Sequence, residues 1–309
     1  MQRFFGLDIP AGARGAVAAM GNFDGVHLGH QAVIDAARAV AAEEGAPLAV
    51  VTFEPHPRSV FAPDAPPFRL TTPDAKARRL ERLGVNRLFE IPFDGALSAL
   101  TPDAFARDVL KDALGLSHVV VGGDFHFGAK RAGDAAALED LGRLLKFGVT
   151  VAQMVSLPGG GISSTRIREA LSEGRPQDAA RMLGHLHRIE GYVLNGEKRG
   201  RTLGFPTANL ALEGLHLPAF GVYAVRVEVL TGPHAGRHDG AASLGVRPQY
   251  DGEVPNLETF LLDFEGDLYG ERISVGLAHY IRPELRFDSE AAFLARMHED
   301  VAEARRLLA

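Results

Sequence analysis

Two histidines stand where a strand-like run ends and a helical stretch begins. The run Ala16–Met20 leads through a glycine-containing loop to the sequence His-Leu-Gly-His at 27–30. Backbone N–H groups and the dipole at the start of a helix favour an anion, and Gly29 lets a triphosphate approach the backbone closely. Because imidazoles can donate hydrogen bonds to charge that develops on a phosphate, we expect His27 and His30 to be catalytic. The alternative is a pair of surface histidines.

A second phosphate-type cluster opens another expected helix after the last strand of the first half. Ser164, Thr165 and Arg166 combine hydroxyl groups with a guanidinium, and these groups suit the β- and γ-phosphates of a nucleotide. When the cluster is viewed alone, a serine or threonine helix cap followed by solvated arginines is an equally good interpretation.

Two aromatic segments follow other strand-like runs, Thr-Phe-Glu-Pro-His-Pro at 52–57 and Gly-Gly-Asp-Phe-His-Phe-Gly at 122–128. Ligands bind at the carboxyl ends of strands in open α/β sheets, and Phe53, Phe125 and Phe127 could stack on a flat aromatic substrate. His56 lies between two prolines, where a structural role in a turn competes with contact to the substrate.

The second half contains a basic glycine segment at 195–209. Gly200 and Gly204 permit a close approach to the backbone, while Thr207 and Asn209 offer hard oxygen ligands for Mg²⁺. Judged by composition alone, the segment is more typical of a hairpin loop than of a nucleotide site.

One carboxylate stands within an otherwise apolar strand-like run over 257–264. Glu258 needs a partner or a chemical purpose there, and general-base catalysis is one such purpose. An outward-facing strand carboxylate is the alternative.

The elements that must position these residues differ between the two halves. The first half alternates apolar runs with Ala-, Leu- and Arg-rich stretches, which predicts βαβ units on a doubly wound parallel sheet of about five strands. Strands are expected at Ala16–Met20, Leu48–Phe53, Val85–Ile91, Ser117–Val121 and Val149–Val155, and helices at Gln31–Glu44, Ala75–Leu83, Pro102–Leu114 and Ala135–Phe147.

From about Ile189 onward, alternating β-branched runs between glycine turns predict an antiparallel barrel or sandwich, followed by a helix capped by Ser289. Its strands are expected at Arg188–Leu194, Gly221–Leu230, His238–Leu244, Leu257–Phe264 and Ile273–Tyr280. A helix-like stretch that is broken at Gly174-Arg175-Pro176 separates these two sequence patterns. We therefore expect an α/β domain at 1–184 and a β domain at 185–309.

Composition narrows the class of protein. The 309 residues are 46% hydrophobic and 23% charged, as in a globular protein. The chain has no cysteine, which excludes disulfides and thiolate metal sites and fits a cytoplasmic location. The net charge of −6, without a basic excess in either half, disfavours nucleic acid as a partner. No apolar run predicts a membrane span, and we expect a monomer or weak homo-oligomer.

Six motifs occur in an order that resembles one family throughout, from Gly21 to about Leu308. They are His-x-Gly-His, Thr-Phe-Glu-Pro-His-Pro, Asp-Phe-x-Phe-Gly, Ile-Ser-Ser-Thr-Arg, Gly-Phe-Pro-Thr-Ala-Asn and Asp-Leu-Tyr-Gly. The chain resembles the prokaryotic bifunctional riboflavin kinase/FAD synthetase family. This resemblance implies a nucleotidyltransferase-like Rossmann domain that adenylylates FMN to FAD, and a barrel that phosphorylates riboflavin to FMN. It also implies ATP, riboflavin and FMN as small-molecule partners, Mg²⁺ as cofactor, and flavin as both substrate and product.

The resemblance further implies residue roles. For adenylylation the implied residues are Gly21, Asn22, Phe23, Asp24, His27, His30, Asp124, Ser164, Thr165 and Arg166. For phosphorylation, Thr207 and Asn209 match the magnesium and nucleotide ligands, Glu258 matches the base for the ribityl hydroxyl, and Arg247 lies near the expected flavin pocket.

Two departures from the family pattern bear on function. Leu183-Gly184-His185-Leu186-His187 replaces Leu-Gly-Arg-Pro-Tyr, which we expect to affect only how the domains meet. Ser243 and Gln249 replace an Asn and a Thr near the expected flavin pocket, which predicts an active kinase with altered flavin affinity. The competing hypotheses are an adenylyltransferase with a non-catalytic flavin-binding barrel and a flavin-sensing regulator without turnover.

Overall fold

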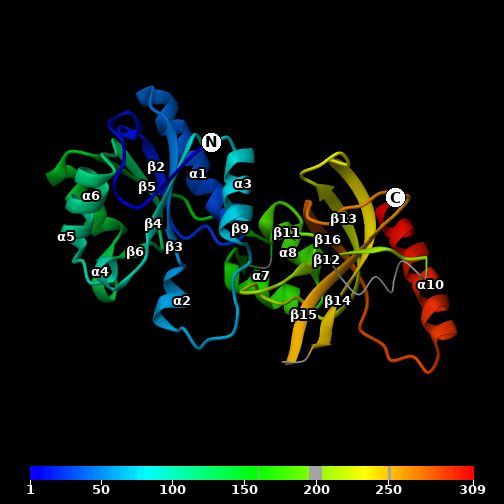
Figure 1. The fold of residues 1–309 in the computed structure, drawn as a ribbon. Helices are drawn as coiled ribbons and strands as arrows, with labels where there is room; N and C mark the ends of the chain where they lie inside the picture. Colours follow the sequence, from blue (N-terminus) through cyan, green and yellow to red (C-terminus); the bar gives the residue numbers. More distant parts are fainter. Residues whose placement is uncertain (159, 195–203, 250–251) are drawn as a thin grey trace. The chain divides into compact units, whose positions relative to one another are not determined.

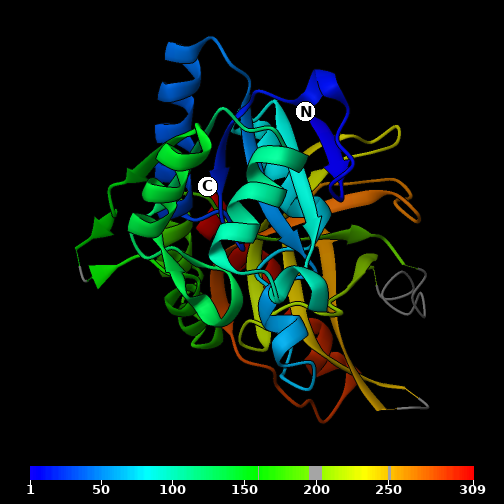
Figure 2. The same cartoon turned by 90° about the vertical axis from the view of Figure 1, so that its left-hand side faces the viewer.

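A computed structural model describes residues 1–158, 160–194, 204–249 and 252–309. The chain forms two compact units, one of residues 1–65 and 73–162, the other of residues 66–72 and 163–309 (Figures 1 and 2). In the described part of the chain, no helix is both long and apolar enough to cross a bilayer.

The first unit is an α/β unit whose main sheet has six parallel strands in the order β1-β4-β3-β2-β5-β8. The strands are β1 (Gln2–Phe5), β2 (Val17–Met20), β3 (Leu48–Glu54), β4 (Arg87–Pro92), β5 (His118–Gly122) and β8 (Gly148–Ala152). The longer helices are α1 (Leu28–Glu44), α3 (Pro73–Arg82), the π-helix η2 (Phe105–Ala113) and α6 (Ala135–Leu145). The short elements are η1 (Ala11–Ala13), α2 (Pro57–Phe61), α4 (Gly95–Ser98), α5 (Pro102–Ala104), β6 (His126–Phe127), η3 (Ala129–Arg131), β7 (Gly133–Asp134), β9 (Ser156–Leu157) and β10 (Gly160–Gly161).

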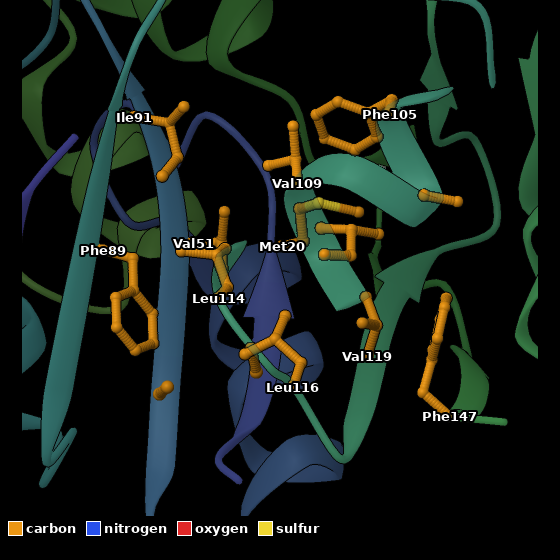
Figure 3. Packing of buried hydrophobic residues seen from close by; sticks show 14 of the residues in the cluster. Met20, Val51, Phe89, Ile91, Phe105, Val109, Leu114, Leu116, Val119 and Phe147 are labelled. Atoms are coloured by element: carbon orange, nitrogen blue, oxygen red, sulfur yellow. The ribbon is translucent and has the colours of Figure 1, made fainter. Parts of the chain in front are cut away.

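Alternation along the buried strands produces a core on each face of this sheet. Val51 of β3 faces the layer formed by η2 and α6, whereas Val50 faces α1 and α3. Figure 3 shows the first of these cores, with Met20 and Val51 beside Val109 and Leu114. Helices therefore cover both faces, as the doubly wound expectation requires (Figure 1).

The second unit contains two helices that precede the strands, α7 (Ser164–Ser172) and α8 (Pro176–Leu183). Its strands are β11 (His187–Tyr192), β12 (Thr207–Ala211), β13 (Gly221–Val229), β14 (Gly236–Gln249), β15 (Gly252–Leu261) and β16 (Arg272–Arg282). The last helix, α10 (Glu290–Leu308), begins after the expected cap, because the Ser289 side chain accepts a hydrogen bond from the Ala292 N–H.

The strands of the second unit form one antiparallel sheet that curls into a barrel. Their order is β11-β16-β13-β14-β15-β12, and an antiparallel bridge between Leu194 and Asn209 joins the last strand back to the first. Leu210, Tyr223, Leu257 and their inward-facing neighbours fill the interior. Outside the barrel, α10 packs on small side chains of β13, β14 and β16, and the ion pair between Arg282 and Asp300 (2.6 Å) fixes it there.

The fold class is confirmed, with differences at individual elements. The edge strand β1 and strand β12 were not expected as strands, because each is only four or five residues long and forms through pairing with a strand distant in sequence. The helix expected over Pro102–Leu114 continues beyond Ala104 as a π-helix. The stretch broken at Gly174-Arg175-Pro176 is the pair α7 and α8.

Candidate active sites

The topology of the parallel sheet selects the place for the first site. The chain passes from β2 through β3 to β4 on one side, whereas β5 and β8 lie on the other side of β2. The order of the strands thus reverses between β2 and β5, and open α/β sheets bind ligands at the carboxyl ends of the strands at such a point. The loop with His27 follows β2, and the loop with Asp124 follows β5.

The loop after β2 has an unusual backbone. Phe23, Gly25 and Val26 all have positive φ values, of 51°, 81° and 46°. Only glycine adopts this region without strain, and a fully buried β-branched valine in it is an outlier of the kind that concentrates at functional sites. The Gln31 side chain holds the turn by donating to the Val26 carbonyl (2.8 Å).

His27 caps helix α1 with its ring. Its Nδ1 accepts a hydrogen bond from the His30 backbone N–H (3.2 Å), so the proton of the neutral ring belongs on Nε2. The rings of His27 and His30 stack with their centroids 3.6 Å apart. A Cβ at position 29 would lie 3.1 Å from Cε1 of His27, so glycine leaves room for the capping ring.

His30 is held neutral. Burial lowers the pKa of its imidazole well below the ordinary value, and the nearby His27 and Lys76 lower it further. Among the described residues, no group hydrogen-bonds its buried Nδ1. The Phe23 ring, 5.1 Å away, supports His30 from the core. Phe23 was predicted to bind nucleotide, but its side chain is buried, which leaves only its backbone for that role.

Lys76 is a residue of this site that the sequence analysis missed. It is almost fully buried on α3, and its ammonium donates to Glu54 Oε1 (2.7 Å), Thr52 Oγ1 (3.0 Å) and the Asn22 carbonyl (3.4 Å). Lys76 therefore ties the loop after β2 to the carboxyl end of β3. The sequence did contain a sign of this burial: Lys76 lies four residues before the apolar Leu80, so both side chains share one face of the helix.

Replacing this lysine tests its anchoring role. We expect Lys76→Met to lower FAD formation from FMN by about tenfold, because the loop after β2 loses a charged donor. Arg82→Met, an exposed cation on the same helix, is the matched control. Glu54→Gln in the Lys76→Met background also removes the carboxylate that Lys76 neutralises in the native chain. FAD formation that stays low after stability recovers then identifies lost positioning. Unchanged FAD formation in Lys76→Met would contradict the role.

The predicted aromatic residues lie in a row of rings at the carboxyl edge of the sheet, but their exposures differ. Phe53 and Phe127 are largely buried core residues, and Phe125 stacks on Phe127 at 5.6 Å. Phe93 and Phe61, which the sequence analysis did not single out, extend the row from Phe53. Because Phe61 is 70% exposed, it is the ring of this row most accessible to a substrate.

The other residues predicted for this site differ in burial and in the element that holds them. His56 caps α2, its Nδ1 accepting from the Arg58 N–H (3.1 Å), so the turn role is present. Asp124 is exposed in the loop after β5, and Asp24 is buried. Ser163 caps α7, which places Ser164, Thr165 and Arg166 in its first turn; these three residues belong to the second compact unit.

The second site lies on the outer face of the barrel. Strand register sets Asn209 of β12 directly opposite Glu258 of β15, and Glu258 opposite Ser243 of β14. Thr207, two residues before Asn209, shares that face, and its carbonyl accepts from the Asn209 amide (3.3 Å). The sheet thus brings Thr207, Asn209 and Glu258 onto one face of two neighbouring strands.

Three further predicted residues, two glycines and an arginine, belong to this half of the chain. Gly200 lies outside the described residues, while Gly204 follows the gap with a positive φ of 83°. Arg247 lies on β14, opposite Val254.

Two enzyme family models match this chain, one in each half. The family model described as FAD synthetase matches residues 9–166, and the model described as riboflavin kinase matches residues 183–308. The two matches leave α7 and α8 largely between them.

Comparison with curated proteins gives the same result along nearly the whole chain. A bifunctional riboflavin kinase/FMN adenylyltransferase of Pseudomonas fluorescens is 43% identical, covering 96% of this chain and 94% of the relative. The protein of that name from Escherichia coli K12 is 40% identical, with 94% and 92% covered. This chain belongs to the bifunctional riboflavin kinase/FMN adenylyltransferase family.

A solved structure from Streptococcus pneumoniae, titled a macrolide-efflux protein, shares the fold at a TM-score of 0.86 and 30% identity. The match covers 99% of both chains.

Proposed function

We propose that the barrel of this protein phosphorylates riboflavin to FMN and that the α/β unit adenylylates FMN to FAD, both with Mg-ATP. The observation that carries the proposal is that each half of the chain matches a different enzyme family and contains its own candidate site. The FAD synthetase match contains the stacked histidine pair, and the riboflavin kinase match contains the row of Asn209 and Glu258.

In the α/β unit, an oxygen of the FMN phosphate attacks the α-phosphorus of ATP. The new P–O bond joins FMN to AMP as FAD, and the bond to the β-phosphate breaks to release pyrophosphate. The Nε2–H of His27 and the N–H groups at the start of α1 donate to the phosphates. His30 starts neutral, and the approach of negative phosphate oxygens favours its protonated form, so it stabilises charge where that charge develops. Asn22, which Lys76 anchors through its carbonyl, lines the same loop.

In the barrel, Glu258 accepts the proton of the terminal ribityl hydroxyl as its oxygen attacks the γ-phosphorus of ATP. ADP leaves with the electrons of the broken P–O bond. The strand register supports this assignment, because Glu258 lies on the outer face, with its backbone neighbours Leu257 and Thr259 buried inside.

The oxygen donors at the barrel site fit Mg²⁺. Thr207 and Asn209 share one face of β12, and Mg²⁺ takes one or two protein oxygens together with substrate phosphates. These two residues would hold the ion, which neutralises phosphate charge when bound. Asn209 Oδ1 accepts a hydrogen bond from the Asn256 amide (3.2 Å), which fixes the direction in which this oxygen points.

The flavin ring of FMN stacks on the exposed part of the aromatic row, with Phe61, Phe93 and Phe125 as the accessible rings. Asp124, which directly precedes Phe125 in the loop after β5, is assigned to the same step. As the family resemblance implies, we further assign Ser164, Thr165 and Arg166 to triphosphate binding and Arg247 to flavin binding.

Incubation of the protein with riboflavin and Mg-ATP tests both activities by separating the flavin products. FMN followed by FAD is the expected result. FAD formed only from added FMN would indicate a non-catalytic barrel, and binding of FMN and ATP without pyrophosphate release would indicate a flavin sensor.

A further inference from the structure

Asn256 connects the two polar residues of the barrel site. It lies on β15 two residues before Glu258, on the same outer face. Its backbone pairs with Ala211 of β12, which makes Asn209 a diagonal cross-strand neighbour within reach of its side chain.

The amide nitrogen of Asn256 has both hydrogens engaged. Nδ2 donates to Asn209 Oδ1 (3.2 Å) and to Glu258 Oε1 (3.4 Å). An amide nitrogen carries two hydrogens and an amide oxygen none, so two acceptors on one side fix which way this amide points. An aspartate of the same shape would set oxygen against oxygen at both contacts.

We propose that Asn256 is a positioning residue for riboflavin phosphorylation, which orients the carboxylate of Glu258 and the amide of Asn209 toward the substrates. The proposal rests on the proposed role of Glu258 as general base. A base must lie within hydrogen-bond reach of the proton that it removes, and a glutamate side chain on a strand, only partly buried as here, has several staggered rotamers. The hydrogen bond that Asn256 donates to Glu258 favours one of these rotamers. The second hydrogen bond of Asn256 holds the Asn209 side chain beside the carboxylate.

Two substitutions separate positioning from packing. Asn256→Ala removes both donors, and we expect kcat for FMN formation to fall about tenfold while KM for riboflavin changes less than about twofold. Asn256→Asp preserves the volume but repels both acceptors, so we expect it to be slower than Asn256→Ala. A residue that only packs would give the opposite order, and an Asn256→Asp rate equal to or above that of Asn256→Ala would overturn the proposal.

A double-mutant cycle tests whether Asn256 acts through Glu258. In a Glu258→Ala background, Asn256→Ala should cost less than in the native chain, because the carboxylate that it orients is absent. An equal loss in both backgrounds would overturn the proposal. A native rate in Glu258→Ala alone would instead refute the proposed base, so the two failures are distinguishable.

The chain supplies its own folding controls. Its five tyrosines lie between residues 192 and 280 and it has no tryptophan, so tyrosine emission during thermal unfolding reports on the barrel. FAD formation from added FMN reports on the α/β unit. Native behaviour in both measurements is expected for each Asn256 variant, and a barrel that unfolds at a lower temperature in proportion to the loss of rate would favour packing and overturn the positioning role.

Discussion

Replacing His30 with alanine is expected to lower FAD formation from FMN by about 100- to 1,000-fold while FMN formation from riboflavin stays at the native rate. The magnitude is that of losing one preorganised donor to a developing phosphate charge. His30 carries this role because its ring is stacked on His27, supported by Phe23 and held neutral by burial. The measurement is pyrophosphate release with FMN and Mg-ATP, alongside FMN formation from riboflavin.

His118→Ala is the matched control for this substitution. His118 starts β5, at the edge of the sheet opposite the proposed site, and bonds to Glu44 and Thr150. An equal loss of FAD formation in both variants would point to damage of the fold. Loss of both activities in a folded His30→Ala protein would contradict the assignment of one reaction to each unit.

The converse substitution, Glu258→Gln, is expected to lower FMN formation by about 100- to 10,000-fold and to leave FAD formation from added FMN intact. Glutamine keeps the shape and can still accept from Asn256, but it cannot take the hydroxyl proton. The pattern to measure is a fall in kcat with little change in KM, because the loss concerns the chemical step.

Glu228→Gln provides the comparison. Glu228 also points outward from a barrel strand, β13, beside Arg188 (4.0 Å), so it reproduces the loss of a strand carboxylate without touching the proposed site. A native phosphorylation rate in Glu258→Gln would show that another group removes the proton.

The sequence by itself determined those candidate residues and elements that show in a short stretch of neighbouring residues. The histidine pair was identifiable because the loop and the helix start adjoin it in sequence. Alternation in the two halves likewise determined the parallel sheet and the barrel, and Ser289 marked the last helix. Each of these signals depends on residues within a few positions of one another, where backbone geometry fixes which side chains share a face.

Tertiary structure alone decided which distant side chains meet. Lys76 gained its meaning only when α3 packed against the ends of β2 and β3. Asn256 became a partner of Asn209 and Glu258 only through the register of β12 on β15, and a shift of one residue would turn Glu258 into the barrel interior. Strand register depends on side-chain contacts along the full length of both strands, and these strands are distant in sequence. The pattern within one segment therefore does not predict which residue faces which.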